Sequence, residues 1–201
     1  PLAPMCGRSH LKSTPTDVAA QFSVTVQHNF PARYNICPTQ PIAIIRQSER
    51  GTREFALARW GFIPEWRKKP EVKPLINARS ETVHEKPTFR NAYKRRRCLI
   101  PADGYYEWKT EGGAKQPYCI RTTDESLYAF AGVWETAVDP DGGEIDTVAI
   151  LTTQSGRDLR PLHHREGVVI QHDDYARWLE ADERDLAGHH DVGAAADRVD
   201  Q

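Results

Sequence analysis

The stretch Thr-Val-Ala-Ile-Leu-Thr-Thr, residues 147–153, contains one of the two longest apolar runs of the chain, and the fold is predicted outward from it. A short, mostly β-branched apolar run is typical of a buried strand. Further strands are predicted at residues 41–47, 53–60, 117–122, 127–134 and 168–171. Short strands at this spacing, with a few helices between them, indicate an α+β domain with a mostly antiparallel sheet.

Three short helices are predicted between and after these strands. Thr16 is expected to cap the first one through its side-chain oxygen. Residues 87–97 have Phe89 and Tyr93 four positions apart, which is the spacing of an amphipathic helix. Asp173 is expected to cap the last helix. The Lys-Arg-Arg-Arg end of the second helix would complement the negative end of its dipole.

Length and composition indicate one globular domain. The chain has 201 residues, of which 39% are hydrophobic and 27% charged, enough for one sizeable core. No apolar run approaches the roughly 18 residues of a membrane span, and no secretory signal is apparent. We expect residues 1–5 to be a leader, residues 6–181 to form the domain and residues 182–201 to be a disordered acidic tail.

The cysteines and charges narrow the choice of partner. Cys6, Cys37, Cys98 and Cys119 show no metal-ligand spacing, so no metal or cofactor is predicted, and reduced thiols in a cytosol are expected. Residues 1–98 hold 18 Lys or Arg and 7 Asp or Glu, whereas residues 99–201 hold 9 and 21. This asymmetry fits a basic face that binds a polyanion such as nucleic acid, or two halves that neutralise each other.

Cys6 is the most reactive candidate in the sequence. If the bond between Met5 and Cys6 is cut, Cys6 has a free α-amine beside its thiol. Such a group condenses with an aldehyde to an imine, and the sulfur then closes a thiazolidine ring on the same carbon. A free α-amine has a pKa of about 7.7–8.0, so a useful fraction is neutral at pH 7. The alternative is a small buried hydrophobic residue.

Three further polar residues are candidates for proton transfer or substrate orientation. Glu107 stands between two aromatic residues, where a carboxylate suits general acid–base catalysis; alternatively it is an exposed glutamate on an aromatic strand. Histidine as a residue type suits proton shuttling at neutral pH, which makes His163 a candidate, and its pairing with His164 as a metal site lacks further ligands at the right spacing. Asn77 could orient a carbonyl or hydroxyl group, or be a turn residue.

Aromatic and cationic residues alternate in residues 59–69, which contain three aromatic side chains and four cations. Such a pattern fits bases stacked above a phosphate-binding surface. Aromatic residues taken singly are more often part of a core.

Seven motifs follow one another in order along the chain. They are Met-Cys-Gly-Arg (5–8), Arg-Tyr-Asn-x-x-Pro-Thr (33–39), Arg-Trp-Gly-x-x-Pro-x-Trp (59–66), Asn-Ala-Arg-x-Glu-Thr (77–82), Cys-Leu-x-Pro-Ala-Asp-Gly-x-Tyr-Glu-Trp (98–108), Lys-Gln-Pro-Tyr (115–118) and His-x-Arg (163–165). Together they strongly resemble the SRAP family, named for SOS response-associated peptidases. The resemblance runs from Met5 to about Leu179.

The resemblance implies a fold and an activity. Members of the family bind single-stranded DNA at abasic sites, where the ring-opened deoxyribose offers an aldehyde. By motif match, Cys6 would capture that aldehyde as a thiazolidine and shield the strand. Asn77 would hydrogen-bond the sugar-derived atoms, and Glu107 and His163 would move protons. The implied fold is a single α+β domain with a curved β-sheet core.

The resemblance also implies a set of DNA contacts. The residues that would hold phosphates are Arg8, Arg79 and Arg165. Those that would line the DNA path or touch the backbone are Pro38, Trp66, Trp108 and Thr152. Two departures from the family bear on these contacts. Glu166-Gly167 stands where relatives usually have Met-Pro or Arg-Pro, and the segment from Lys68 to Lys73 looks long.

Two other functions remain open at this stage. The chain could be a thiol peptidase acting on its own leader or on other proteins, with a lyase-like activity on DNA, or it could be a non-covalent reader of modified DNA. The expected partner is single-stranded DNA with abasic sites. The protein is expected to be a monomer and not to associate with a membrane. The expected location is the cytoplasm of a bacterium, or the nucleus if the chain is eukaryotic.

Overall fold

A closed barrel of five strands forms the centre of the computed structural model, which describes residues 7–27, 29–67, 73–139, 141–180 and 199–200. The barrel strands are β3 (Pro41–Gln47), β4 (Arg53–Trp60), β6 (Arg97–Ala102), β9 (Tyr128–Val138) and β10 (Glu144–Gln154). Their order is β10-β4-β3-β6-β9, and β9 pairs with β10 again, which closes the ring. Only the β10–β4 pair among these is parallel.

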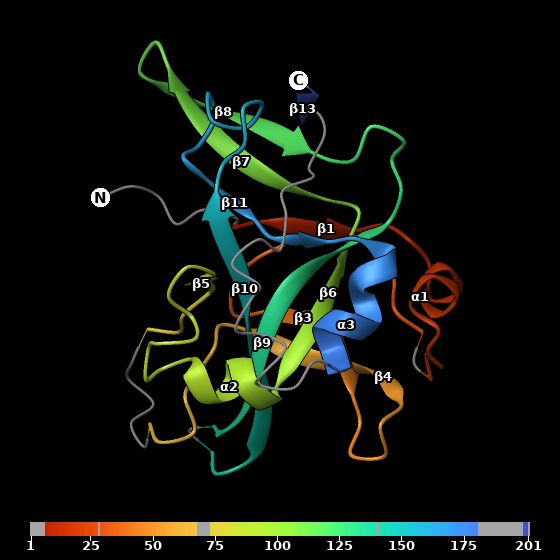
Figure 1. Cartoon of the computed structure of the whole chain (residues 1–201). Helices are drawn as coiled ribbons and strands as arrows, with labels where there is room; N and C mark the ends of the chain where they lie inside the picture. Colours follow the sequence, from red (N-terminus) through yellow and green to blue (C-terminus); the bar gives the residue numbers. More distant parts are fainter. Residues whose placement is uncertain (1–6, 28, 68–72, 140, 181–198, 201) are drawn as a thin grey trace.

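A second sheet lies at one end of the barrel (Figure 1). Its order is β13-β8-β7-β1-β2. The strands are β1 (Ser9–Leu11), β2 (Arg33–Ile36), β7 (Gly104–Glu111), β8 (Ala114–Ile120) and β13 (Val199–Asp200). The chain passes from the barrel into this sheet at Asp103, whose carboxylate accepts hydrogen bonds from the backbone N–H groups of Lys12 at 2.6 Å and Ser13 at 2.8 Å. The buried carboxylate therefore fixes the end of β1 against the start of β7.

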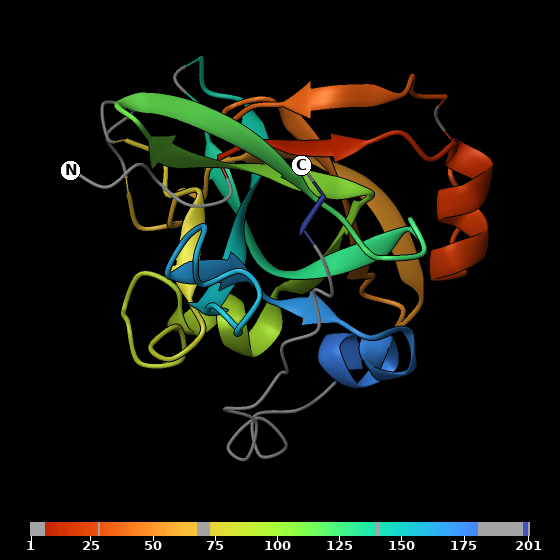
Figure 2. The same cartoon turned by 90° about the horizontal axis from the view of Figure 1, so that it is seen from above.

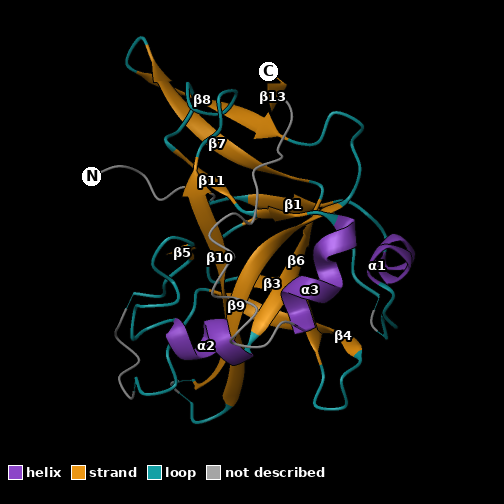
Figure 3. Ribbon diagram, in the orientation of Figure 1, coloured by secondary structure: helices purple, strands orange, loops and turns teal. Residues whose placement is uncertain are grey.

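Three short strands flank the barrel. They are β5 (Asn77–Arg79) and β11 (Arg165–Gly167), which both pair with β10, and β12 (Val169–Ile170), which pairs with β9. The helices are α1 (Pro15–Phe22), α2 (Arg90–Arg95), the 3-10 turn η1 (His172–Asp174) and α3 (Tyr175–Glu180). Strands dominate the described chain (Figure 3), and α1 and α3 lie outside the curved strands when seen from above (Figure 2). The predicted α+β fold with a curved, mostly antiparallel sheet is confirmed.

The strands with apolar runs are close to the prediction. The bounds of β3 and β4 match it, residues 147–153 lie inside the longer β10, and the predicted strand 127–134 lies inside β9 except for its first residue. Ile42, Ile44 and Ile45 of β3 are all buried, because the barrel interior takes one face and the surrounding elements cover the other. A continuous apolar run is what a strand buried on both faces requires.

The helix ends differ from the prediction. Thr14, not Thr16, caps α1, because Pro15 occupies the first helical position and Asp17 completes a capping box with Thr14. The second helix is shorter than predicted, since residues 97–102 belong to β6. Asp173 lies within η1 rather than capping α3.

Three predictions concern parts of the chain that the structure describes only partly or not at all. The leader at residues 1–5, with Cys6, lies outside the described residues, as do residues 68–72 and 182–198. Of the predicted acidic tail, the structure describes only β13, which pairs with β8. The described helices include none that is long and apolar enough to span a membrane.

Candidate functional site

The C-terminal half of β10 gathers four of the predicted residues. β5 runs parallel to it and places Arg79 beside Thr152, with Asn77 two residues earlier beside Ile150. β11 runs antiparallel on the same strand and places Arg165 opposite Gln154. Residues that are 84 or more positions apart in the sequence are therefore neighbours only because β10 aligns both short strands.

Arg165 is held by a carboxylate that the sequence did not reveal as its partner. Its guanidinium donates to Glu81 at 2.6 and 2.9 Å in a bidentate pair, and also to the hydroxyl of Thr152 at 3.0 Å. The hydrogen bonds from Arg165 lower the pKa of Glu81, so this carboxylate stays ionised near neutrality. Arg165 is thus rigidly placed, and a phosphate there would share the guanidinium with Glu81.

His163 ends the loop that connects β10 to β11. Its backbone N–H donates to the carbonyl of Leu159 at 3.0 Å, and its Nδ1 atom lies 3.1 Å from the backbone N–H of Arg165. The Nδ1 atom also lies 3.2 Å from the carbonyl oxygen of Arg165, so which of these two contacts forms depends on whether Nδ1 or Nε2 carries the proton of the neutral ring. That Nε2 atom is buried and has no hydrogen-bond partner among the described residues. The imidazole is therefore oriented with its Nε2 atom available to a ligand, as donor or acceptor.

Glu107 is buried, and the strand register places it opposite the first described residues of the chain. The β1–β7 register pairs Ser9 with Tyr105, and the backbone N–H of Tyr106 donates to the carbonyl of Arg8 at 3.0 Å. Continued by two residues, this register brings Gly7 opposite Glu107. Glu107 is 6% exposed, so it is not the exposed glutamate of the alternative reading. The carboxylate lies beside the strand that leads directly to Cys6.

Arg8 and Trp108 lie on the other face of the same sheet. The Arg8 guanidinium donates to the side chain of Asn35 at 3.0 Å and lies 5.9 Å from the centre of the Trp108 ring. Trp108 is 37% exposed, and its contact with Arg8 is at the outer limit of a cation–π interaction. Arg8 has no carboxylate partner within the described chain. Its charge is therefore available to a phosphate.

Phe130 links two groups of predicted residues. One group lies on or beside β10 and includes Asn77, Arg79, Thr152 and Arg165. The other lies on or beside β7 and includes Arg8, Glu107 and Trp108. The ring of Phe130 makes an edge contact with Tyr105 of β7, with the ring centres 5.6 Å apart. On β11, a Cβ atom at Gly167 would lie 2.4 Å from Cε1 of the same ring. The absence of a side chain at Gly167 therefore lets β11 approach the core. Glu107 and Arg165, each two residues from a Phe130 contact, belong to the same end of the molecule.

The remaining predicted residues stand on separate turns. Pro38 is half-buried in the turn between β2 and β3, where the N–H of Thr39 donates to the carbonyl of Trp60 at 2.7 Å. Trp66 is 64% exposed in the loop after β4. Arg79 is exposed and forms no ion pair within the described chain, although its charge helps to lower the pKa of Glu81. None of the described registers places Pro38 or Trp66 in either group.

Sequence reasoning missed Glu81 and Asn35 as partners of the predicted arginines. Both residues are part of motifs, in 77–82 and 33–39 respectively, so a signal was present. Their pairing with Arg165 and Arg8 depends on strand register, which a motif does not encode. In the described part of the chain, no group of three or more His, Cys, Asp or Glu is arranged to hold a metal ion.

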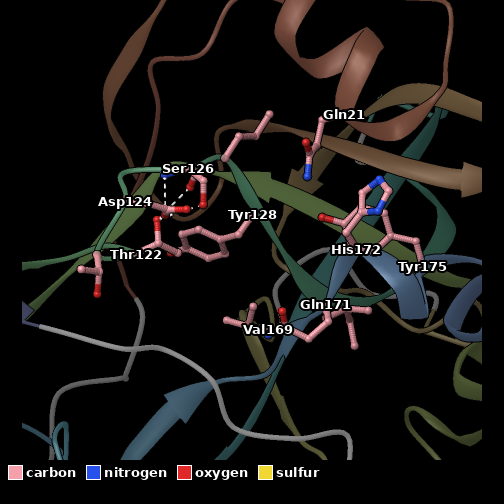
Figure 4. A pocket seen from close by; sticks show the side chains of 12 residues that line it. Gln21, Thr122, Asp124, Ser126, Tyr128, Val169, Gln171, His172 and Tyr175 are labelled. Atoms are coloured by element: carbon pink, nitrogen blue, oxygen red, sulfur yellow. Dashed lines mark hydrogen bonds between the residues drawn. The ribbon is translucent and has the colours of Figure 1, made fainter.

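A separate pocket of about 330 Å³ lies among the β8–β9 loop, β12 and α3 (Figure 4). It contains none of the predicted site residues and no cysteine, lysine or arginine. Its Asp124 carboxylate accepts a hydrogen bond from the backbone N–H of Ser126 at 3.1 Å. The pocket lacks the nucleophile and the cations that a DNA lesion would require.

Comparison with known proteins places the chain among proteins named for abasic sites. A model of the SOS response associated peptidase (SRAP) family matches residues 5–198. The abasic site processing protein YoaM of Bacillus subtilis is 37% identical over 180 residues, covering 87% of this chain and 79% of the relative. YedK of Escherichia coli, with the same descriptive name, is 29% identical over 181 residues, with coverage of 87% and 79%.

Solved structures show the same fold. A Bordetella bronchiseptica protein is 30% identical and has a TM-score of 0.80, with 96% of each chain covered. A Bacteroides thetaiotaomicron protein is 26% identical and also has a TM-score of 0.80, covering 90% of this chain and 85% of that one.

Proposed function

The chain belongs to the SOS response associated peptidase family, and from that premise we propose that it processes abasic sites in single-stranded DNA by forming a covalent crosslink through Cys6. The names of its relatives support abasic-site processing. The observation that carries the finer proposal is the buried Glu107, which lies level with Gly7 on the strand leading to Cys6. The crosslink shields the lesion from strand cleavage.

The proposed reaction joins two groups with the loss of water. The free α-amine of Cys6 adds to the aldehyde of the ring-opened deoxyribose, and the carbinolamine loses water to give an imine. The Cys6 thiol then adds to the imine carbon, and its proton passes to the nitrogen, which closes the thiazolidine. Opening the sugar ring and expelling water both need proton transfer, which we assign to Glu107 and His163. Asn77 orients the sugar-derived hydroxyl groups.

The proposed DNA path uses the cations and exposed aromatic residues around these groups. Arg8 and Arg79 form no ion pair within the described chain and are assigned to phosphates. Arg165 is assigned to a phosphate that it shares with Glu81, with Thr152 holding the guanidinium. The three path-lining residues carried over from the family are Pro38, Trp66 and Trp108. Exposed aromatic rings beside cations are typical of single-strand binding.

A denaturing gel with an abasic single-stranded oligonucleotide tests the crosslink. We expect wild type to form a heat-stable adduct and Cys6→Ser to form none, because serine cannot close the thiazolidine. Cys37→Ser is the matched control, since Cys37 is a free, half-buried cysteine outside both residue groups. An equally heat-stable adduct from Cys6→Ser would overturn the proposal.

Self-cleavage of the Met5–Cys6 bond is a second candidate function, favoured by the description of the family as peptidases. While Met5 is attached, the Cys6 nitrogen is an amide, which cannot form an imine, and the thiol alone gives only a reversible hemithioacetal. Hydrolysis with one water would release residues 1–5 and free the amine. Intact mass spectrometry after mixing with abasic DNA should find stable adducts only on chains without residues 1–5. An adduct that retains them would contradict the thiazolidine.

A further inference from the structure

Residues 86–97 contain six lysines or arginines and no aspartate or glutamate. The fold accounts for two of the six. Arg97 is buried, and its guanidinium donates to the backbone carbonyls of Trp178 at 2.6 Å and Tyr93 at 2.8 Å. Arg96 pairs with Glu135 at 2.8 Å. These contacts tie the end of α2 to α3 and β9, and they satisfy the expected role of cations at a helix C-terminus.

Three of the other cations have no such role. Lys86, Arg90 and Arg95 are exposed, and none of them forms an ion pair with a residue that the structure describes. The backbone N–H of Arg90 donates to the carbonyl of Lys86 at 2.9 Å, so these two residues are one helical turn apart. Like charges at this spacing destabilise a helix. Local stability therefore gives no reason for this arrangement.

Arg95 leads into a groove between the end of α2 and the β3–β4 turn. The groove has a volume of about 770 Å³, and its lining includes five arginines and two glutamates. One of these glutamates, Glu54, is already paired with Arg46 at 2.6 Å. Arg50 lines the groove from the turn and is exposed. In Figure 1, α2 and this turn lie at the end of the barrel away from β7 and β8.

Trp134 lines the same groove but does not offer a free ring face to a base. The guanidinium carbon of Arg46 lies 4.2 Å from the centre of its ring, and that of Arg96 lies 5.8 Å away. Both are within cation–π range. The groove therefore presents charge rather than a stacking platform, which suits phosphate groups without regard to base sequence.

The cations continue from the proposed DNA path. Trp66 lies in the loop after β4, and Phe62 of that loop packs on Phe89 at the start of α2, with ring centres 5.1 Å apart. The loop that carries Trp66 therefore packs against the segment that contains Lys86 and Arg90. Arg95 and Arg50 follow at the groove.

We propose that Lys86, Arg90, Arg95 and Arg50, here called the α2 stripe, bind phosphates of the same nucleic-acid strand beyond the lesion. The inference rests on the proposed function, because the strand is the one held at Cys6. It extends the binding site from the lesion to the far end of the barrel. The contacts are electrostatic, so they lengthen the footprint without adding sequence preference.

The test compares unmodified single strands of about 6 and about 20 nucleotides, lengths that bracket common single-strand site sizes. The variant combines Lys86→Ala, Arg90→Ala and Arg95→Ala. The control combines Lys12→Ala, Lys115→Ala and Arg177→Ala, which removes three other exposed cations. Fluorescence anisotropy gives the slope of log K against log salt for each protein with each strand length. Thermal unfolding of both triple variants should match wild type, because all six side chains are exposed and the two ion pairs lost from the control, Lys12–Glu125 and Arg177–Asp174, lie at the surface, where such pairs contribute little.

On the longer strand, we expect the stripe variant to make the negative slope shallower by about 2, at about 0.7 for each lost phosphate contact. On the short strand, both variants should match wild type. No change on the longer strand, or an equal change on both lengths, would overturn the proposal, and the former would favour an acidic protein as partner. Because this assay uses unmodified DNA, a failure of crosslinking at Cys6 would appear separately, in the denaturing gel.

Discussion

Glu166 of β11 is a carboxylate buried in the fold. It is 3% exposed, and it accepts a hydrogen bond from the backbone N–H of Gly156 at 3.3 Å. Burial raises the pKa of this carboxyl group, and the hydrogen bond offsets part of that effect. Because the folded-state pKa is raised, the group stabilises the fold below the pKa of the unfolded chain, and this stabilisation is lost as pH rises through the folded-state pKa.

We therefore expect Glu166→Gln to increase the free energy of unfolding at pH 7 by about 1 kcal/mol, because glutamine keeps an acceptor for Gly156 without a charge. Below about pH 4 the difference should vanish, since the carboxyl group is then protonated in both states. Urea unfolding at both pH values measures this. Glu144→Gln, at an exposed position in β10, is the control. A gain of equal size at both pH values would contradict the explanation.

Glu107 and His163 should affect the rate of crosslinking more than the affinity for DNA. Proton transfer by a placed side chain typically contributes about 100- to 10,000-fold. We expect Glu107→Gln and His163→Ala to slow adduct formation or its reversal on that scale, as followed by quenched time courses on denaturing gels. Glu111→Gln and His164→Ala are the neighbouring controls. Unchanged kinetics in both main variants, with unchanged binding, would remove the two residues from the mechanism.

Sequence could name candidate site residues but not the partners that the structure gives to some of them. Cys6, Asn77, Glu107 and His163 are all motif residues, and each motif carries its own local chemistry. Glu81 lies in a motif too, yet nothing local indicates that it pairs with Arg165, 84 positions later. That pair exists because β10 aligns β5 and β11, and register is a property of the whole sheet.

At the scale of single elements, α1 offers a direct comparison of two threonines. The side chain of Thr14 accepts a hydrogen bond from the N–H of Asp17 at 3.2 Å, and the Asp17 carboxylate accepts one from the N–H of Thr14 at 2.8 Å. We expect Thr14→Ala to lower the free energy of unfolding by about 1 kcal/mol through loss of this cap. Thr16→Ala should cost much less, because Thr16 lies inside the helix. Denaturant unfolding would contradict this if the order of the two costs were reversed.

The length of an element decides how well sequence predicts it. β3 and β4 have seven and eight residues with clear apolar patterns, and their predicted bounds match the structure. β5 and β11 have three residues each and were not predicted as strands. A three-residue strand has too few positions for a period of two to show, so only its pairing with β10 defines it. The site depends on these short strands, which is why its geometry could not be predicted.

At the scale of the whole molecule, the barrel interleaves the basic and acidic halves of the sequence. β3 and β4 come from the basic half, β6 crosses the boundary between the halves, and β9 and β10 come from the acidic half. Ion pairs therefore cross between the halves, including Arg46–Asp146 at 2.7 Å and Arg96–Glu135 at 2.8 Å. The alternative in which the two halves neutralise each other is therefore confirmed for some cations, while other cations remain at the surface without an ion pair among the described residues.

The cations left over should make binding of unmodified single strands strongly dependent on salt. Arg8, Arg79, Lys86, Arg90 and Arg95 form no ion pair among the described residues. If about four to six phosphates are neutralised, log K should fall with log salt at a slope of about −3 to −4. Fluorescence anisotropy between low and physiological salt measures the slope. An oligonucleotide with an uncharged methylphosphonate backbone is the control and should show almost none. A flat response with the natural backbone would mean that these arginines and lysines do not contact the strand, and that the surface charge of the basic half serves another partner.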